Sequence, residues 1–136
     1  MINLAILASG SGTNAEALIN HFKDSKDINV RLVMSNKKDA GVLDRAKRLN
    51  VPSLVFSKSE MHSDDFINIF KENHIDLVIL AGFLLKIPTS LISLYPNRII
   101  NIHPALLPKY GGKGMYGSNV HEAVIENKES QSGITI

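Results

Sequence analysis

The sequence contains no cysteine. This absence excludes a disulfide framework, a thiolate nucleophile and any zinc or iron–sulfur centre that cysteine would hold. Because disulfides belong to oxidising compartments, a chain without them suits a reducing one. We therefore expect a cytoplasmic protein.

The sequence also has little excess charge of either sign. It has 15 lysine and arginine residues against 13 aspartate and glutamate residues, a formal net charge of +2. The adjacent basic pairs are Lys37-Lys38 and Lys47-Arg48. Because nonspecific nucleic-acid binding requires a basic surface, no nucleic-acid partner is expected. The charge balance does not exclude small anionic ligands.

Long hydrophobic runs are absent as well. The longest, residues 77–85, is far shorter than the about 20 residues that a membrane-spanning helix needs. Met1 to Asn3 lacks the basic start of a secretory signal. We expect no membrane partner and no export. The 136 residues, 44% of them hydrophobic and 21% charged, predict a single domain over residues 1–136.

Short hydrophobic runs alternate with helical patterns along the chain. This alternation predicts an α/β fold with a doubly wound, mainly parallel sheet, Rossmann-like, in three α/β/α layers. Residues 104–118, rich in glycine and proline, are expected to form an irregular loop that serves as an active-site flap. Strands are predicted at 4–8, 30–34, 54–56, 77–80, 99–103 and 133–136, with helices after Gly12, over 39–49, from Ser63, over 90–94 and around 120–124.

The turn after the first predicted strand reads Ser9-Gly10-Ser11-Gly12-Thr13-Asn14. Free N–H groups at a helix start make an anion site, so a phosphate is the natural ligand there. Thr13 or Asn14 is expected to cap this helix. Its buried face is predicted to carry Ala15, Leu18 and Phe22.

The same turn fits the dinucleotide fingerprint G-x-G-x-x-A. The acidic residue that would bind a ribose hydroxyl is replaced by residues 35–38, Ser-Asn-Lys-Lys. NAD is therefore disfavoured, whereas an NADP-dependent reductase remains an alternative because two lysines could bind the extra phosphate. A tight turn without any ligand is the other alternative.

Asn101 and His103 occupy alternate positions of the last predicted strand before the flap, so both should point to one face. An amide donor beside an imidazole suits addition to a carbonyl group. The alternative is that both only bond to neighbouring loops. No two histidines have metal-ligand spacing, so no metal is expected; His121, which borders the flap, is a weaker site candidate.

The segment Asn101-Ile102-His103-Pro104-Ala105-Leu106-Leu107-Pro108, together with Ser9–Asn14 and Leu80-Ala81-Gly82-Phe83, resembles the phosphoribosylglycinamide formyltransferase family of purine biosynthesis. The resemblance implies an enzyme that transfers a formyl group from the co-substrate 10-formyltetrahydrofolate to the amine of glycinamide ribonucleotide, without a metal. It implies that Asn101 binds the formyl oxygen and that His103 is the general acid.

The resemblance also assigns binding residues. It implies that Gly12, Thr13 and Asn14 bind the ribonucleotide phosphate. The folate would contact the segment Leu84, Leu85, Lys86 and Ile87, as well as Asn101 and, at the folate tail, Lys58.

Two departures from the family pattern stand out. Where relatives commonly have His-x-His, this chain has Asn119-Val120-His121. The catalytic aspartate of the family would lie beyond Ile136, so we expect the chain to lack the C-terminal third of the domain and to have no useful activity alone. The alternatives are a non-catalytic phosphate- or folate-binding fragment, formyltetrahydrofolate deformylase and methionyl-tRNA formyltransferase.

Overall fold

The computed structural model describes all 136 residues, and the chain forms two compact units, Met1–Ile100 and Asn101–Ile136. Each unit has hydrophobic clusters of its own: two in the first unit and one in the second. None of the helices combines the length and hydrophobicity of a membrane span.

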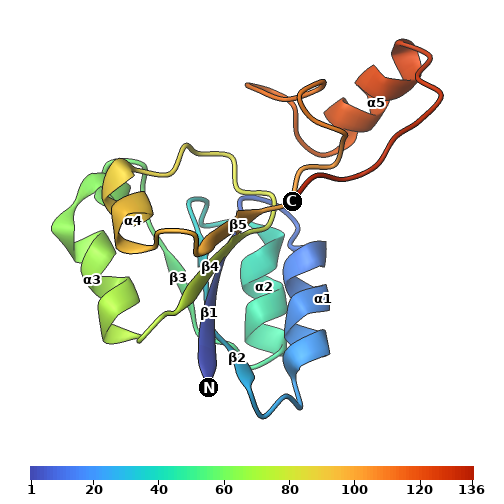
Figure 1. Cartoon of the computed structure of the whole chain (residues 1–136). Coiled ribbons are helices and arrows are strands. Elements are labelled where there is room, and N and C mark those ends of the chain that lie inside the picture. Colours follow the sequence, from blue (N-terminus) through green and yellow to red (C-terminus); the bar gives the residue numbers. More distant parts are fainter. The chain divides into compact units, whose positions relative to one another are not determined.

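The first unit is built on a five-stranded sheet (Figure 1) with the strand order β3-β2-β1-β4-β5. The pairs β1/β2, β1/β4 and β2/β3 are parallel. The order reverses beside β1, which is the switch point where ligands collect in doubly wound sheets. The strands are β1 (Ile2–Leu7), β2 (Ile28–Ser35), β3 (Ser53–Val55), β4 (Leu77–Leu80) and β5 (Ile99–Asn101).

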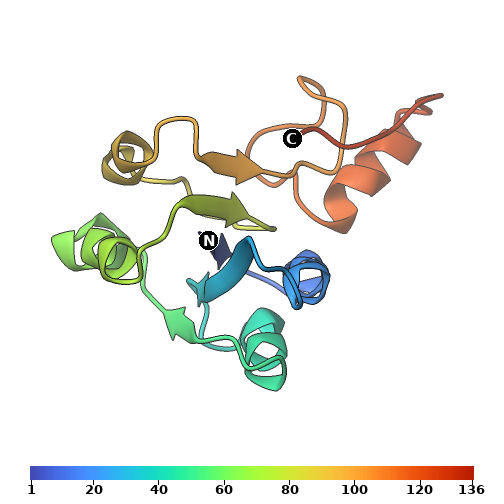
Figure 2. The same ribbon diagram turned by 60° about the horizontal axis from the view of Figure 1, so that its bottom comes forward.

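Helices cover both faces of this sheet (Figure 2). One hydrophobic cluster joins α1 and α2 to one face, and a second joins α3 and α4 to the other. The predicted three-layer α/β/α class is therefore confirmed. The helices are α1 (Thr13–Phe22), α2 (Gly41–Arg48), α3 (Asp64–Glu72) and α4 (Thr89–Leu94), with the short 3-10 helix η1 (Glu60–His62) before α3.

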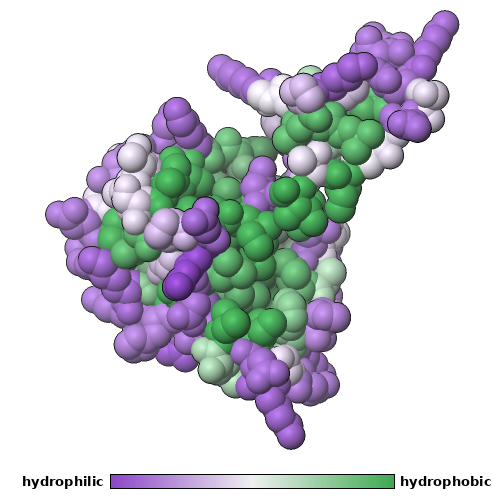
Figure 3. Space-filling view, viewed as in Figure 1, coloured by the Kyte–Doolittle hydropathy of each residue, from purple (hydrophilic) through white to green (hydrophobic).

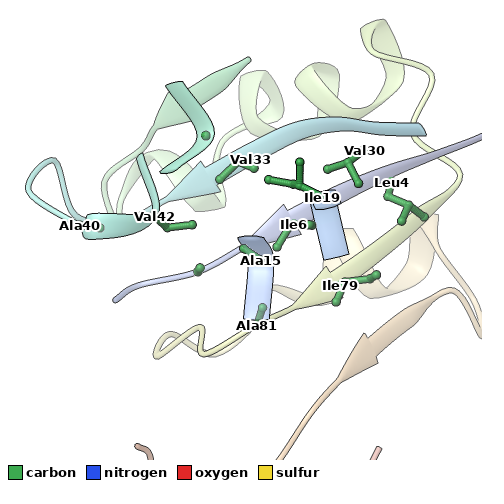
Figure 4. Packing of buried hydrophobic residues seen from close by; sticks show 12 residues of the cluster. Leu4, Ile6, Ala15, Ile19, Val30, Val33, Ala40, Val42, Ile79 and Ala81 are labelled. Carbon is green, nitrogen blue, oxygen red and sulfur yellow. The ribbon is translucent and has the colours of Figure 1, made fainter. Parts of the chain in front are cut away.

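Small and β-branched side chains make the cluster under α1 and α2 (Figure 4). Ala15 and Ile19 are the buried residues of α1, whereas Leu18 and Phe22 are only partly buried. The prediction that Ala15 lies on the buried face is therefore confirmed, but the prediction did not include Ile19. Ile19 lies four residues after Ala15, so the two share the centre of the stripe while Leu18 and Phe22 border it.

The opposite cluster, the aromatic cluster, contains the buried rings of Phe56, Phe66, Phe70 and Tyr95. Phe66 lies between Phe56 and Phe70, with ring centroids 4.9 and 5.1 Å away. The Ser63 side chain accepts a hydrogen bond from the N–H of Phe66, which confirms the predicted start of α3. Figure 3 shows hydrophobic residues gathered on one face of the first unit, where Figure 1 draws β4 and β5.

The second unit contains α5 (Ser118–Glu126) and a long irregular segment before it. Val120 and Val124 of α5 pack with Ala105 in a small hydrophobic cluster. The predictions of an irregular segment over 104–118 and of a helix around 120–124 are confirmed.

Two strand predictions near this unit need correction. β5 ends at Asn101 rather than at His103, and residues 133–136 form no strand. His103 and Thr135 instead form an isolated antiparallel bridge. Pro104 has no N–H to continue a ladder. Ile134 and Ile136 are 61% and 78% exposed, so no sheet covers the apolar pattern that suggested a strand.

Candidate functional site

The loops that follow β1, β2 and β4 meet at one edge of the sheet, because these three strands run parallel. Ligands of such sheets bind outside this carboxyl edge. Two groups of residues predicted from the sequence lie here: Gly12 to Asn14 after β1, and Leu84 to Ile87 after β4.

Gly12 ends the first loop in a left-handed conformation, with φ +78°, and is the N-cap of α1. A Cβ built on Gly12 would overlap the side chain of Val42 and lie 2.7 Å from the Val42 Cα. The prediction that Thr13 or Asn14 caps the helix is therefore wrong. No side chain caps α1, because α2 approaches this turn too closely for any residue but glycine.

Free backbone donors follow this turn. The N–H of Glu16 donates to the carbonyl of Gly12 over 2.9 Å, which is the first bond of the helical ladder, whereas the N–H groups of Thr13, Asn14 and Ala15 donate to no protein acceptor. Thr13 and Asn14 are exposed. An uncapped helix start with positive dipole character fits an anion such as phosphate.

The helix α2 holds the carbonyl groups of the same turn. The Val42 N–H donates to the Gly10 carbonyl over 3.0 Å, and Arg45 Nε donates to the Ser11 carbonyl over 2.7 Å. The Arg45 guanidinium also pairs with Glu16, which pairs again with Arg48 at 2.6 Å. These bonds turn the loop's carbonyl oxygens towards α2 and leave its amide donors for a ligand.

This charge cluster predicts an acid-dependent stability. The hydrogen bonds from Arg45, chiefly, and from Arg48 hold the pKa of Glu16 below its ordinary value of 4.5. A carboxyl group with a lowered pKa stabilises the folded state above its unfolded pKa, and that contribution disappears as the pH falls through the folded pKa. We expect the melting temperature to drop below about pH 4.5, and to drop less in Glu16→Gln.

The control for this measurement is Glu129→Gln. The pKa of Glu129 is also lowered, first by the hydrogen bond from Tyr110, and this carboxyl belongs to the second unit. In each variant the melting temperature should drop less on acidification than in the unsubstituted protein, because one carboxyl group with a lowered pKa has been removed. An acid transition identical in Glu16→Gln and the unsubstituted protein would contradict the prediction.

The segment after β4 alternates between exposed and partly buried residues. Leu85 and Ile87 pack against the aromatic cluster, whereas Leu84 is 39% exposed and Lys86 is exposed. Lys58 is exposed in the turn after β3. In that turn the Ser57 hydroxyl accepts from the N–H of Glu60, whose carboxylate accepts from the N–H of Ser57. This capping box holds the backbone around Lys58 and leaves its ammonium group free.

His103 lies in the second unit, where its backbone and ring are both held. Its N–H and carbonyl bond to Thr135 over 2.8 and 2.9 Å. Its Nε2 lies 2.6 Å from the carbonyl oxygen of Tyr110. A carbonyl oxygen only accepts, so Nε2 carries the hydrogen and Nδ1 is the ring atom left for other partners. Asn101, the last residue of β5, is exposed.

A polar network holds Tyr110 itself. The Tyr110 hydroxyl donates to the Glu129 carboxylate over 2.8 Å, and Lys109 pairs with the same oxygen at 3.3 Å. Partial burial, together with the Glu129 carboxylate, raises the pKa of the Tyr110 hydroxyl. This network fixes the loop that carries the carbonyl partner of His103.

The remaining sequence candidates have simpler surroundings. Lys37 and Lys38 are exposed after β2. His121 is exposed in the first turn of α5, and the Asn119 side chain donates to the Gly114 carbonyl over 3.1 Å. No group of three or more histidine, aspartate or glutamate side chains could hold a metal ion.

Sequence reasoning missed three residues that organise these sites: Ser9, Arg45 and Tyr110. The sequence pattern places Ser9 in a turn and Arg45 in a helix and indicates none of the contacts that they make. A serine directly after the predicted strand of residues 4–8 was a detectable signal. The carbonyl of Tyr110 leaves no signal in a sequence.

Comparison with known proteins identifies the family. Residues 2–136 match the family profile described as formyl transferase. This chain belongs to the formyl transferase family. The chloroplastic phosphoribosylglycinamide formyltransferase of Arabidopsis thaliana is 41% identical over 140 residues, which cover 98% of this chain and 48% of that protein. The Escherichia coli phosphoribosylglycinamide formyltransferase is 33% identical over 141 residues, which cover 99% of this chain and 64% of that enzyme.

Solved structures agree with this family membership. Glycinamide ribonucleotide transformylase 1 from Geobacillus kaustophilus superposes with a TM-score of 0.85 at 35% identity, covering 99% of this chain and 72% of that structure. The expected Rossmann-like fold and the resemblance to this family are thus confirmed. Against the plant relatives, this formyl transferase chain spans about half of their length.

Proposed function

We propose that this protein takes part in the transfer of a formyl group from 10-formyltetrahydrofolate to the amine of glycinamide ribonucleotide. The observation that carries the proposal is the pair of free, exposed amide donors at Thr13 and Asn14, in a chain whose named relatives are phosphoribosylglycinamide formyltransferases. Those donors suit the ribonucleotide phosphate, with Gly12, Thr13 and Asn14 as its binding residues.

The reaction consists of one addition and one elimination. The substrate amine attacks the formyl carbon of the folate, forming a carbon–nitrogen bond and a tetrahedral adduct with a negative oxygen. The bond from that carbon to folate N10 then breaks. The amine loses one proton and N10 gains one, so charge and atoms balance without a protein nucleophile.

Asn101 and His103 have the chemistry for these two needs. The exposed Asn101 amide can donate to the oxygen as its negative charge develops. His103 keeps a hydrogen on Nε2 for the Tyr110 carbonyl, so the proton that reaches folate N10 would come from Nδ1 of the imidazolium.

The segment Leu84–Ile87 is proposed to contact the folate. Its exposed Leu84 offers apolar surface for a flat ring, while the partly buried Leu85 and Ile87 pack against the cluster and hold the backbone beside it. Lys86 and Lys58 are exposed cations that could meet the carboxylates of a folate tail.

Isothermal titration calorimetry tests the proposal. We expect the chain to bind glycinamide ribonucleotide and tetrahydrofolate in separate titrations. We expect no binding of NADP, whether or not one of these ligands is present. Binding of both ligands, with formyl transfer absent from the full-length protein as well, would favour the alternative of a non-catalytic binding protein. Binding of NADP alone would overturn the proposal in favour of the reductase.

A further inference from the structure

The hydroxyl of Ser9 joins three loops at the carboxyl edge of the sheet. Ser9 Oγ donates to Asn36 Oδ1 over 2.6 Å and accepts from the N–H of Leu84 over 2.9 Å. The Ser9 N–H donates to the Gly82 carbonyl over 3.0 Å. The residue is 4% exposed. The segment after β4 is thus attached to the turn after β1 through one buried serine.

The direction of each bond follows from the chemistry of the groups. A hydroxyl has one hydrogen, and the Asn36 carbonyl oxygen takes it, so a lone pair of Ser9 Oγ is left for the Leu84 N–H. Asn36 therefore orients the hydroxyl, and the hydroxyl holds Leu84. Gly82, with φ +73°, makes the sharp turn that brings the segment back to Ser9.

We propose that Ser9 is a positioning residue for the folate, acting through the backbone of Leu84. This inference rests on the proposed function, because Leu84 begins the segment assigned there to the folate. Without the Ser9 hydroxyl the backbone from Leu84 to Ile87 has no polar attachment to the β1 turn. The folate would then have to order the segment as it binds, and its affinity would fall.

The loss of this bond should affect binding more than folding. Leu84 is 39% exposed, so water can satisfy its N–H when the serine hydroxyl is removed. The phosphate turn has its own supports, since Val42 and Arg45 hold the carbonyl groups of Gly10 and Ser11. Ser9 should therefore influence the folate and leave phosphate binding intact.

The test is Ser9→Ala in the full chain, with tetrahydrofolate and inorganic phosphate as separate probes. We expect tetrahydrofolate to bind about tenfold more weakly, the equivalent of one lost hydrogen bond, and phosphate affinity to change by less than about twofold. Amide hydrogen exchange without ligand should show faster exchange at Leu84 in the variant.

Two further variants separate this role from a general loss of structure. Asn36→Asp keeps an acceptor for the Ser9 hydroxyl and should retain tetrahydrofolate affinity, whereas Asn36→Ala should behave like Ser9→Ala. Ser25→Ala is the matched control, because the Ser25 hydroxyl accepts from the N–H groups of Asp27 and Ile28 before β2. It should change neither ligand affinity.

Unchanged exchange at Leu84, or unchanged tetrahydrofolate affinity in Ser9→Ala, would overturn the inference. An unsubstituted chain that binds no tetrahydrofolate would contradict the proposed function instead. In that case the exchange rate of the Leu84 amide decides by itself whether Ser9 holds the segment.

Discussion

Replacing His103 with alanine in the full-length protein is expected to lower the turnover of formyl transfer by about 10²-fold or more, the usual contribution of a general acid. Removing the Asn101 amide should cost about as much, because an oxyanion donor contributes on the order of 10²-fold. Both groups act on charges that develop in the transition state. Substrate affinity should therefore change much less, and the change in folate absorbance measures the rate.

Conservative variants separate chemistry from folding in this experiment. His103→Gln retains an N–H group for the Tyr110 carbonyl but cannot transfer a proton, so it should be as slow as His103→Ala. Asn101→Asp keeps the shape of the side chain but loses the amide hydrogens that donate to the formyl oxygen, so it should be as slow as the variant without the amide. His62→Ala, which replaces the exposed last residue of η1, should be as active as the unsubstituted protein. A loss in His103→Gln that appears only as weaker substrate binding would contradict the assigned role.

Gly12→Ala is expected to abolish ribonucleotide binding and to destabilise the first unit by about 2–4 kcal/mol. Two costs add here. An L-residue is disfavoured at φ +78°, and the new Cβ would lie 2.7 Å from the backbone Cα of Val42. Either α2 moves or the turn opens, and both outcomes displace the amide donors of α1. Chemical denaturation and calorimetry with glycinamide ribonucleotide measure the two effects.

Gly10→Ala is the matched control. Gly10 lies in the same turn, but nothing approaches within 4 Å of an added Cβ and its φ is not positive. The free energy of unfolding of the Gly10→Ala variant should differ from that of the unsubstituted protein by less than about 0.5 kcal/mol. The double variant Gly12→Ala/Val42→Ala should recover only part of the loss, because the clash with the Val42 backbone remains. Ribonucleotide affinity unchanged in Gly12→Ala would place the phosphate elsewhere.

Features that depend on neighbours in the sequence could be predicted well. The hydrophobic run of β4 was predicted at its observed bounds, and Ser63 was predicted to start α3, because strand burial and helix capping leave local patterns. The anion turn was also found from its glycines. The cap of α1 was wrong because the crowding by Val42 comes from another helix.

The contacts that organise the candidate site could not be predicted. Ser9 and Leu84 are 75 positions apart, and Arg45 reaches Ser11 across 34. Such contacts follow from strand order, and no local pattern encodes them. The strands predicted over residues 99–103 and 133–136 were too long for the same reason. His103 and Thr135 pair only with each other, in an isolated bridge, and no local pattern shows that the pairing stops there.

Thr135 makes the geometry of His103 a collective property of the second unit. Its backbone bonds to His103 in both directions, and its hydroxyl donates to the Ala105 carbonyl and accepts from the N–H of Leu107. The chain between these partners contains α5, so closing the loop requires that helix to be in place. The amides of His103, Leu107 and Thr135 should consequently exchange with solvent in one shared opening event. A substitution that loosens α5 would then disorder the imidazole without touching it.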